Sequence, residues 1–228
     1  MKIPQNWLDE DFAIFEKMRS HKAPYTIVVE GIELIVLPNV FSPKYYSDSL
    51  WFAQELSKLT KGKSVLEIGT GTGIIAIFCS LNGAKVVATD INEIAVKNAK
   101  INAKEHNLSI DIRYGNMFSP IRQNEKFDII FWDHPFTNCR EEVEDILSKA
   151  GFDKNYQELR KYISGAKAHL STNGKLLLGT GSFADLEEIK KIAEENGYVL
   201  TLIVKKSLPF TAGSDIPNEY FIYELVKY

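Results

Sequence analysis

The sequence predicts an α/β fold built on a doubly wound, mainly parallel sheet. Two observations lead to this prediction. From Ser64 onward, short apolar runs alternate with amphipathic helical stretches, and the first of these runs leads into a cluster of glycines. Strands that alternate with helices form a parallel sheet covered on both faces. The chain has 228 residues, 45% of them hydrophobic and 25% charged, so a disordered or low-complexity chain is excluded.

The first 60 residues are expected to form an elaboration of the same domain. A helix is predicted over 6–19, because apolar residues recur near one face; these are Trp7, Leu8, Phe12, Phe15 and Met18. Two β-rich runs within 25–37 flank Glu30-Gly31 and predict a hairpin. A second helix is expected over 49–59. The predicted division is an N-terminal helix, hairpin and lid-like segment, 1–60, and a main domain, 61–228.

The main domain is expected to contain seven strands and the helices between them. The expected strands are 64–69, 85–90, 110–115, 127–132, 175–181, 198–206 and 219–228. The expected helices are 74–82, 93–106, 140–149, 156–170 and 186–196. The segment 207–218 is too short for a crossover helix, so the final strand is expected to run antiparallel. If the strand before it is parallel to the first, Phe210 should border the substrate opening.

Composition narrows the functional classes. The formal net charge is -3, which does not suit a dedicated nucleic-acid module, although a local basic patch is compatible with it. The two cysteines, Cys79 and Cys139, have no metal-ligand spacing, so no metal site and no disulfide framework are expected. No apolar run has the length of a membrane span, and no targeting segment is apparent. We therefore expect a cytoplasmic protein without membrane partners.

The segment VLEIGTGTG, Val65 to Gly73, joins a strand to a helix through three glycines. The dinucleotide fingerprint needs glycine at its first, third and sixth positions. Counted from Gly69, the sixth position is Ile74, so that fingerprint fails. Glu67 lies just before the glycines and would repel a pyrophosphate. The loop therefore favours a ligand with a cationic or hydroxyl-rich end.

Asp90 ends the second strand of the main domain, 21 positions after Gly69. A carboxylate at this place can accept hydrogen bonds from two ribose hydroxyls. The alternative is that Asp90 caps the next helix, since Asp90 and Glu93 match a capping box. Asn92 could serve as the cap instead, and beside the glycine loop the ribose interpretation is favoured.

VLEIGTGTG and VVATDIN resemble the first and second motifs of the class I S-adenosylmethionine-dependent methyltransferases. The resemblance extends from Ser64 to Tyr228 and implies a Rossmann-like, seven-stranded sheet with an antiparallel final strand. It also implies S-adenosyl-L-methionine as cofactor. The residues that it places around the cofactor are Glu67, Gly69, Thr70, Gly71, Gly73, Asp90, Ile91, Asn116 and Met117. Asn116 stands where an acid commonly meets the adenine amine, and a plain turn at this point is the alternative.

Asp133-His134-Pro135-Phe136 follows the fourth expected strand. It is similar to the Asn/Asp-Pro-Pro-aromatic motif of methyltransferases that act on planar nitrogens. The resemblance implies that Asp133 and a backbone carbonyl of His134 or Pro135 accept the N–H groups of the substrate, and that Phe136 covers the planar group. His134 replaces the first proline of the motif. It is either a base or a side chain that points to solvent.

The segment from Phe41 to Ser49 resembles the one that precedes the core in HemK-like and small-domain methyltransferases. There an acid–threonine pair approaches the cofactor, and here Asp48-Ser49 resembles that pair, with Ser49 keeping the hydroxyl. The sequence thus predicts a methyltransferase acting on an amine or amide nitrogen of a protein, RNA or small molecule. The alternatives are a biosynthetic small-molecule O-methyltransferase and a cofactor-binding protein without activity.

Overall fold

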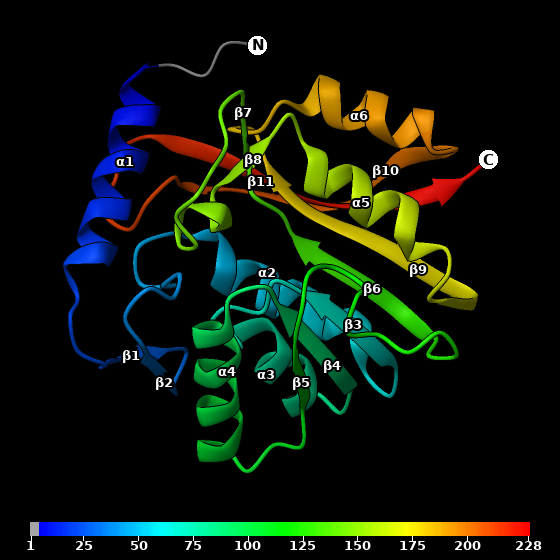
Figure 1. The fold of residues 1–228 in the computed structure, drawn as a ribbon, viewed down its shortest axis with the longest axis horizontal. Helices are drawn as coiled ribbons and strands as arrows, with labels where there is room; N and C mark the ends of the chain where they lie inside the picture. The colour runs from blue at the N-terminus through cyan, green and yellow to red at the C-terminus, as the bar shows by residue number, and fades with distance from the viewer. Residues whose placement is uncertain (1–4) are drawn as a thin grey trace.

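The computed structural model describes residues 5–228, so residues 1–4 of the expected elaboration lie outside the described part. The main sheet contains β3 (Ser64–Ile68), β4 (Lys85–Asp90), β5 (Asp111–Tyr114), β6 (Phe127–Asp133), β9 (Leu170–Gly181), β10 (Tyr198–Pro209) and β11 (Pro217–Lys227). Its strand order is β10-β11-β9-β6-β3-β4-β5 (Figure 1). The expected seven-stranded sheet is confirmed.

Strand directions also agree with the prediction. The strands β9, β6, β3, β4 and β5 are mutually parallel, and β11 pairs antiparallel with both β9 and β10. Because β10 and β9 are each antiparallel to β11, β10 runs in the same direction as β3. The carboxyl end of β10, the last strand but one, therefore lies at the same edge of the sheet as the carboxyl ends of β3, β4 and β6.

Helices cover both faces of this sheet. They are α2 (Asp48–Thr60), α3 (Ile74–Leu81), α4 (Glu93–Glu105), α5 (Gln157–Ala166) and α6 (Leu186–Glu195). Neighbouring residues of a strand point to opposite faces. Accordingly, Phe131 of β6 packs on Phe52 of α2, whereas Trp132 packs on Tyr162 of α5. Both faces of β6 are therefore buried, which explains its continuous apolar sequence.

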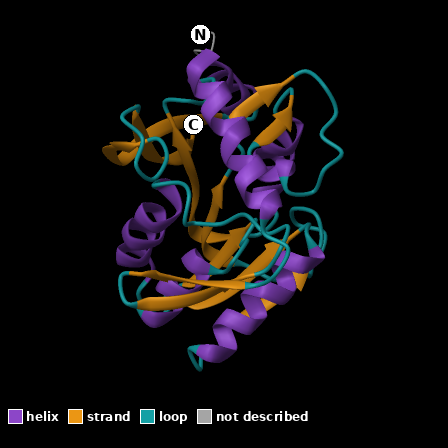
Figure 2. Cartoon of the chain, turned by 90° about the vertical axis from the view of Figure 1, so that its left-hand side faces the viewer, coloured by secondary structure: helices purple, strands orange, loops and turns teal. Residues whose placement is uncertain are grey.

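The N-terminal hairpin consists of β1 (Tyr25–Val29) and β2 (Ile32–Val36) and lies against α4 (Figure 2). Two buried asparagines of α4 hold it. Asn98 Oδ1 accepts from Leu37 N at 2.7 Å, and Asn102 Oδ1 accepts from Ile35 N at 2.9 Å. Asn102 Nδ2 also donates to Thr72 O in the glycine loop at 2.8 Å. One side chain thus connects the hairpin to the loop.

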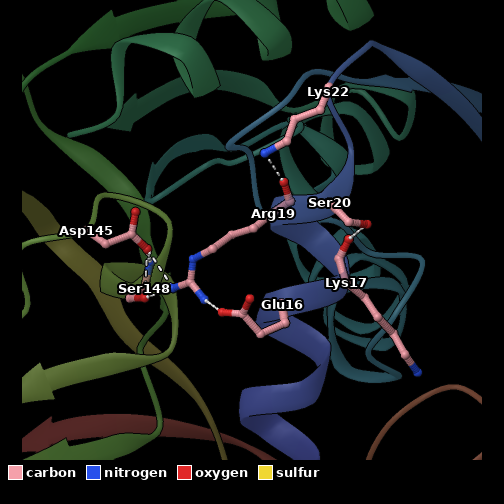
Figure 3. A network of polar contacts seen from close by, with 7 residues as sticks. All are labelled: Glu16, Lys17, Arg19, Ser20, Lys22, Asp145 and Ser148. Carbon is pink, nitrogen blue, oxygen red and sulfur yellow. Dashed lines mark hydrogen bonds and ion pairs between the residues drawn. The ribbon is translucent and has the colours of Figure 1, made fainter.

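The helix α1 (Gln5–Ser20) is tied to a distant part of the chain through Arg19 (Figure 3). Its guanidinium donates to Asp145 Oδ2 at 2.8 Å and to Ser148 Oγ at 2.5 Å, and it also binds Glu16. The buried face of α1 includes Ile14, Phe15 and Met18. Phe12 is 53% exposed, so its expected place on that face is wrong.

The expected helix over 140–149 is absent. This part forms β7 (Thr137–Cys139), a turn of 3-10 helix (Ser148–Ala150) and β8 (Phe152–Lys154), with β7 and β8 parallel. The sequence would place Glu141 beside Glu144 and Asp145 on a helix surface, where like charges repel. The next helix begins only at Gln157, because Tyr156 has a φ of 49° and cannot lie inside a right-handed helix.

Residues from the N-terminal elaboration and the main domain share one hydrophobic core. Phe15 and Leu34 belong to the same buried cluster as Ile130 and Leu177. Cys79 of α3 is also buried in this core. Within residues 5–228, the helices lack the combination of length and apolar character that crossing a bilayer requires.

Candidate active site

A cavity of about 300 Å³ opens at the carboxyl ends of β3, β4, β5 and β6. This edge is where ligands bind in open parallel sheets. The lining contains most of the residues that the sequence selected, namely Ser49, Glu67, Gly69, Thr70, Gly71, Asp90, Ile91, Asn116, Met117, Asp133, His134, Pro135 and Phe136. Segments more than 80 positions apart in the chain therefore meet in one place.

The glycine loop needs its glycines for two different reasons. Gly69 and Gly71 have φ values of +69° and +56°, which side-chain-bearing residues rarely adopt. A Cβ at Gly69 would lie 3.1 Å from Trp132 Nε1, so the loop packs closely on β6. A Cβ at Gly71 would meet no atom within 4 Å, so the backbone there faces open space and can be approached by a ligand.

Gly73, which the sequence also assigned to the cofactor, is absent from the cavity lining. It begins α3 with a φ of +86°, and a Cβ there would lie 3.1 Å from Ala99 Cβ of α4. Its lack of a side chain lets α3 and α4 approach each other. The geometry therefore assigns Gly73 to helix packing.

Asp90 holds the glycine loop and the turn after β4 together. Its Oδ2 accepts from Gly71 N and its Oδ1 from Asn92 N, both at 2.8 Å. The cap of α4 is Asn92, whose side chain accepts from Ile94 N, so the capping alternative for Asp90 is wrong. Burial raises the pKa of Asp90 to about 6, despite the backbone N–H groups that lower it. The ribose role stays a prediction.

Glu67 lies under the glycine loop and is 2% exposed. Thr70 Oγ1 donates to its Oε2 at 2.7 Å, which ties the loop to β3. Burial raises the pKa of Glu67 to about 8. An ionisable carboxyl in this position is suited to a cationic ligand group, which would restore the charged form.

The stability of the protein without cofactor is expected to fall as the pH rises from about 5 to 8. Glu67 has an ordinary pKa of 4.5 and a pKa of about 8 in the folded chain, so between these values the folded state binds more protons than the unfolded state. One such group contributes a slope of up to about 1.4 kcal/mol per pH unit. Glu67→Gln should flatten the pH dependence measured by urea unfolding, and the exposed Glu187→Gln should not. An unchanged slope in Glu67→Gln would contradict this.

Asp133 ends β6 beside the glycine loop. Within the described residues, no hydrogen bond reaches its carboxyl group, which faces the cavity. Burial raises its pKa well above the usual range, and the neighbouring Asp48 and Glu67 raise it further. A carboxyl without a protein partner in a ligand-sized cavity is able to receive a donor from a substrate.

His134 is buried, with 2% of its surface exposed, so the solvent-facing alternative is wrong. Its Nε2 lies 2.9 Å from Thr180 Oγ1, and its ring packs against Trp132, Phe136 and Tyr156. Burial lowers its pKa to about 3, which keeps the ring neutral. These contacts hold the backbone of His134 and of the residues next to it in place.

Sequence reasoning missed Asp11 of α1, which belongs to no motif. Asp48 was singled out together with Ser49, as the acid of the pair that resembles the HemK-like segment. Both line the cavity, together with Tyr46, whose hydroxyl donates to Asp11. Phe210 was expected at the substrate opening, and it lies in the lining.

Comparison with known proteins identifies a matching family model and several relatives. The family model of the methyltransferase small domain matches residues 31–206. A putative protein N5-glutamine methyltransferase of Methanocaldococcus jannaschii is 32% identical, over 81% of this chain and 93% of the relative. The release factor glutamine methyltransferase of Aliivibrio fischeri is 28% identical, over 74% of this chain and 63% of the relative. A longer bifunctional methyltransferase of Rickettsia typhi is 33% identical, and this chain covers 28% of the length of that relative.

Solved structures share the fold at low sequence identity. A 16S rRNA N2 methyltransferase of T. thermophilus, solved with AdoMet and guanosine, has a TM-score of 0.61 and 18% identity, covering 89% of this chain and 50% of that one. A Pyrococcus furiosus methyltransferase has a TM-score of 0.59 and 20% identity, covering 97% of this chain and 98% of that one. The chain belongs to the methyltransferase small domain family and is an S-adenosylmethionine-dependent methyltransferase.

Proposed function

We propose that the chain methylates a nitrogen atom of a protein or an RNA. The observation that carries this proposal is the carboxyl of Asp133 at the end of β6, which has no hydrogen-bond partner within residues 5–228 and is followed by His134, Pro135 and Phe136 in the same cavity. The relatives named above that act on glutamine side chains support a nitrogen acceptor.

The residues present fit the cofactor. Glu67 offers a carboxyl group for a cationic group, Gly71 leaves open space at the backbone, and Asp90 offers carboxyl oxygens for hydroxyls. We propose Glu67, Gly69, Thr70 and Gly71 for the methionine part. Asp90 and Ile91 are proposed for the ribose, Asn116 and Met117 for the adenine, and Ser49 for the adjoining wall. When bound, S-adenosylmethionine supplies an electrophilic methyl group on a sulfonium.

Besides binding the cofactor, the site orients the methyl acceptor. Asp133 accepts one N–H of the substrate, and the His134 or Pro135 carbonyl accepts another. The Phe136 carbonyl is engaged, because Tyr156 Oη donates to it at 2.7 Å. That hydrogen bond and the buried His134 ring hold the segment rigid, so the acceptor meets the methyl group in a fixed direction. Such positioning lowers the barrier by several kcal/mol.

His134 is proposed as a positioning residue rather than a base. A proton acceptor near neutral pH needs a pKa close to that pH, and burial lowers the pKa of His134 to about 3. The ring takes the place of a proline and supplies rigidity through packing. We also propose a cytoplasmic location, since both cysteines are free thiols, as is usual in a reducing compartment.

A methyl-transfer assay tests the proposed function. The purified protein is incubated with S-adenosylmethionine carrying a tritiated methyl group and with host lysate divided into protein, RNA and small-molecule fractions. We expect label in the protein or RNA fraction. Label confined to small molecules would favour the biosynthetic alternative. Cofactor binding without any labelled product would favour a binding protein that lacks activity.

A further inference from the structure

Three carboxyl groups gather on one side of the cavity, and we call Asp11, Asp48 and Asp133 the acidic corner. They come from α1, from the first residue of α2 and from the end of β6, and all three line the cavity. They are close enough to affect one another, since Asp48 raises the pKa of both Asp11 and Asp133. The chain thus concentrates carboxyl groups beside the proposed acceptor position.

Much of the hydrogen-bonding capacity of the acidic corner is unused. Asp48 is 6% exposed, and its Oδ1 accepts from Ser49 N and Ser49 Oγ. Across the described residues, Asp48 accepts hydrogen bonds only from Ser49 and from its own backbone N–H, the Asp133 carboxyl accepts none, and no Lys or Arg forms an ion pair with the corner. Buried carboxylates are normally paired. These oxygens are therefore available to a ligand with several N–H donors.

Aromatic rings stand beside the same corner. Tyr46 donates to Asp11, stacks on Phe41 with ring centroids 5.1 Å apart, and meets the edge of Phe210 at 5.7 Å. All three rings line the cavity. Aromatic faces attract cations, and they also cover the alkyl groups attached to an ammonium. Carboxyl groups and aromatic rings together form a typical recognition site for alkylammonium groups.

The ionisable residues of the whole cavity lining also favour a cationic ligand. Eight lining residues are Asp or Glu, whereas the basic ones described are Lys149 and Lys154, both near β8. Lys154 is already paired with Glu142 at 3.0 Å. An anionic acceptor would be disfavoured by these acids. A cationic acceptor favours the ionised form of carboxyl groups whose pKa burial raises, such as those of Glu67 and Asp133.

We propose that the methyl acceptor is an alkyl amine of a protein, entering as its ammonium ion, and that Asp48 and Asp133 bind and deprotonate it. This inference rests on the proposed function and specifies its substrate class. An N–H bond of R–NH3⁺ breaks, and the proton passes to a carboxylate oxygen of the pair. The freed nitrogen lone pair then forms the N–CH3 bond while the C–S⁺ bond breaks and its electron pair returns to sulfur. The products are R–NH2⁺–CH3 and neutral S-adenosylhomocysteine.

The surroundings make these carboxyl groups better proton acceptors than ordinary ones. Burial raises the pKa of Asp48 to about 6, and burial together with Asp48 and Glu67 raises that of Asp133. Asp11 and Tyr46 face the pair from α1 and from the segment before α2, and Tyr220 of β11 also lies near all three acids. An incoming ammonium stabilises the charged carboxylates until the proton moves.

Sinefungin is a suitable probe, because a C–NH3⁺ group replaces the S⁺–CH3 group of the cofactor and so places an ammonium where acceptor and methyl meet. By calorimetry at pH 7.5, we expect sinefungin to bind at least about tenfold more tightly than S-adenosylhomocysteine, which lacks that group. Asp48→Asn and Asp133→Asn should reduce this ratio to about threefold or less. The matched control Glu187→Gln, which removes an exposed acid of α6 outside the cavity, should keep it.

Equal affinity for the two compounds, or a ratio unchanged in both Asn variants, would overturn the inference and leave the proposed function standing. Failure of both compounds to bind would overturn the proposed function together with the inference. The labelled protein product gives a second readout. Acid hydrolysis should leave the tritium in a non-volatile methylated amino acid. Release as volatile methylamine would identify an amide acceptor, and label in RNA would also overturn the inference.

Discussion

Asp133→Ala is expected to lower the turnover number by two to three powers of ten. The carboxyl lies at the end of β6 in the cavity, has no partner within the described residues, and is placed to hold the acceptor nitrogen. An anionic group there also stabilises the cation that forms as nitrogen takes the methyl group. Loss of one such positioned polar group usually costs about 10²–10³ in rate. The measurement is steady-state methyl transfer to the labelled acceptor.

Two comparisons make the Asp133 result interpretable. Affinity for S-adenosylmethionine should change far less than turnover, because the carboxyl acts on the acceptor. Asp133→Asn should keep more activity than Asp133→Ala if orientation dominates, and should resemble it if proton removal dominates. The ammonium acceptor proposed above predicts the second pattern. Normal turnover in Asp133→Ala would refute the assignment, even with a lowered melting temperature.

Asp90→Ala is expected to weaken S-adenosylmethionine binding by about ten- to a hundredfold. Charge-assisted hydrogen bonds from ribose hydroxyls contribute about 1.5–3 kcal/mol each, and about 1.4 kcal/mol corresponds to a factor of ten. The substitution also removes the acceptor of Gly71 N, so the glycine loop loses its connection to the turn after β4. Calorimetric titration of both proteins gives the ratio.

Asp185→Ala provides a matched control for Asp90. Like Asp90, Asp185 lies between a strand of the sheet and the next helix. Unlike Asp90, it caps that helix, accepting from Glu188 N at 3.2 Å, and it lies outside the cavity lining. Loss of such a cap typically costs about 1 kcal/mol of stability. Asp185→Ala should therefore be destabilised while keeping its affinity for the cofactor. If Asp90→Ala keeps its affinity as well, the role of Asp90 is limited to holding the loop.

Most of the fold could be predicted from local patterns in the sequence. The strand at 64–69 was recognisable because it is apolar on both faces and ends in glycines, and the antiparallel final strand because 207–218 leaves no room for a helix. The helix expected over 140–149 is absent, although Val143, Ile146 and Leu147 have the spacing of one helical face. In the structure they lie in the segment that connects β7 and β8 beside the cavity.

The sequence by itself determined the glycine loop, Asp90 and the tetrapeptide from Asp133 to Phe136, because each is contiguous and follows directly from a strand. In a parallel sheet such positions must meet at one edge. Only the tertiary structure decided that Gly73 packs against Ala99, that His134 is buried and neutral, and that Asp11 and Asp48 join Asp133. Those properties depend on which distant segments pack together and exclude water, and neither local propensity nor spacing along the chain encodes that.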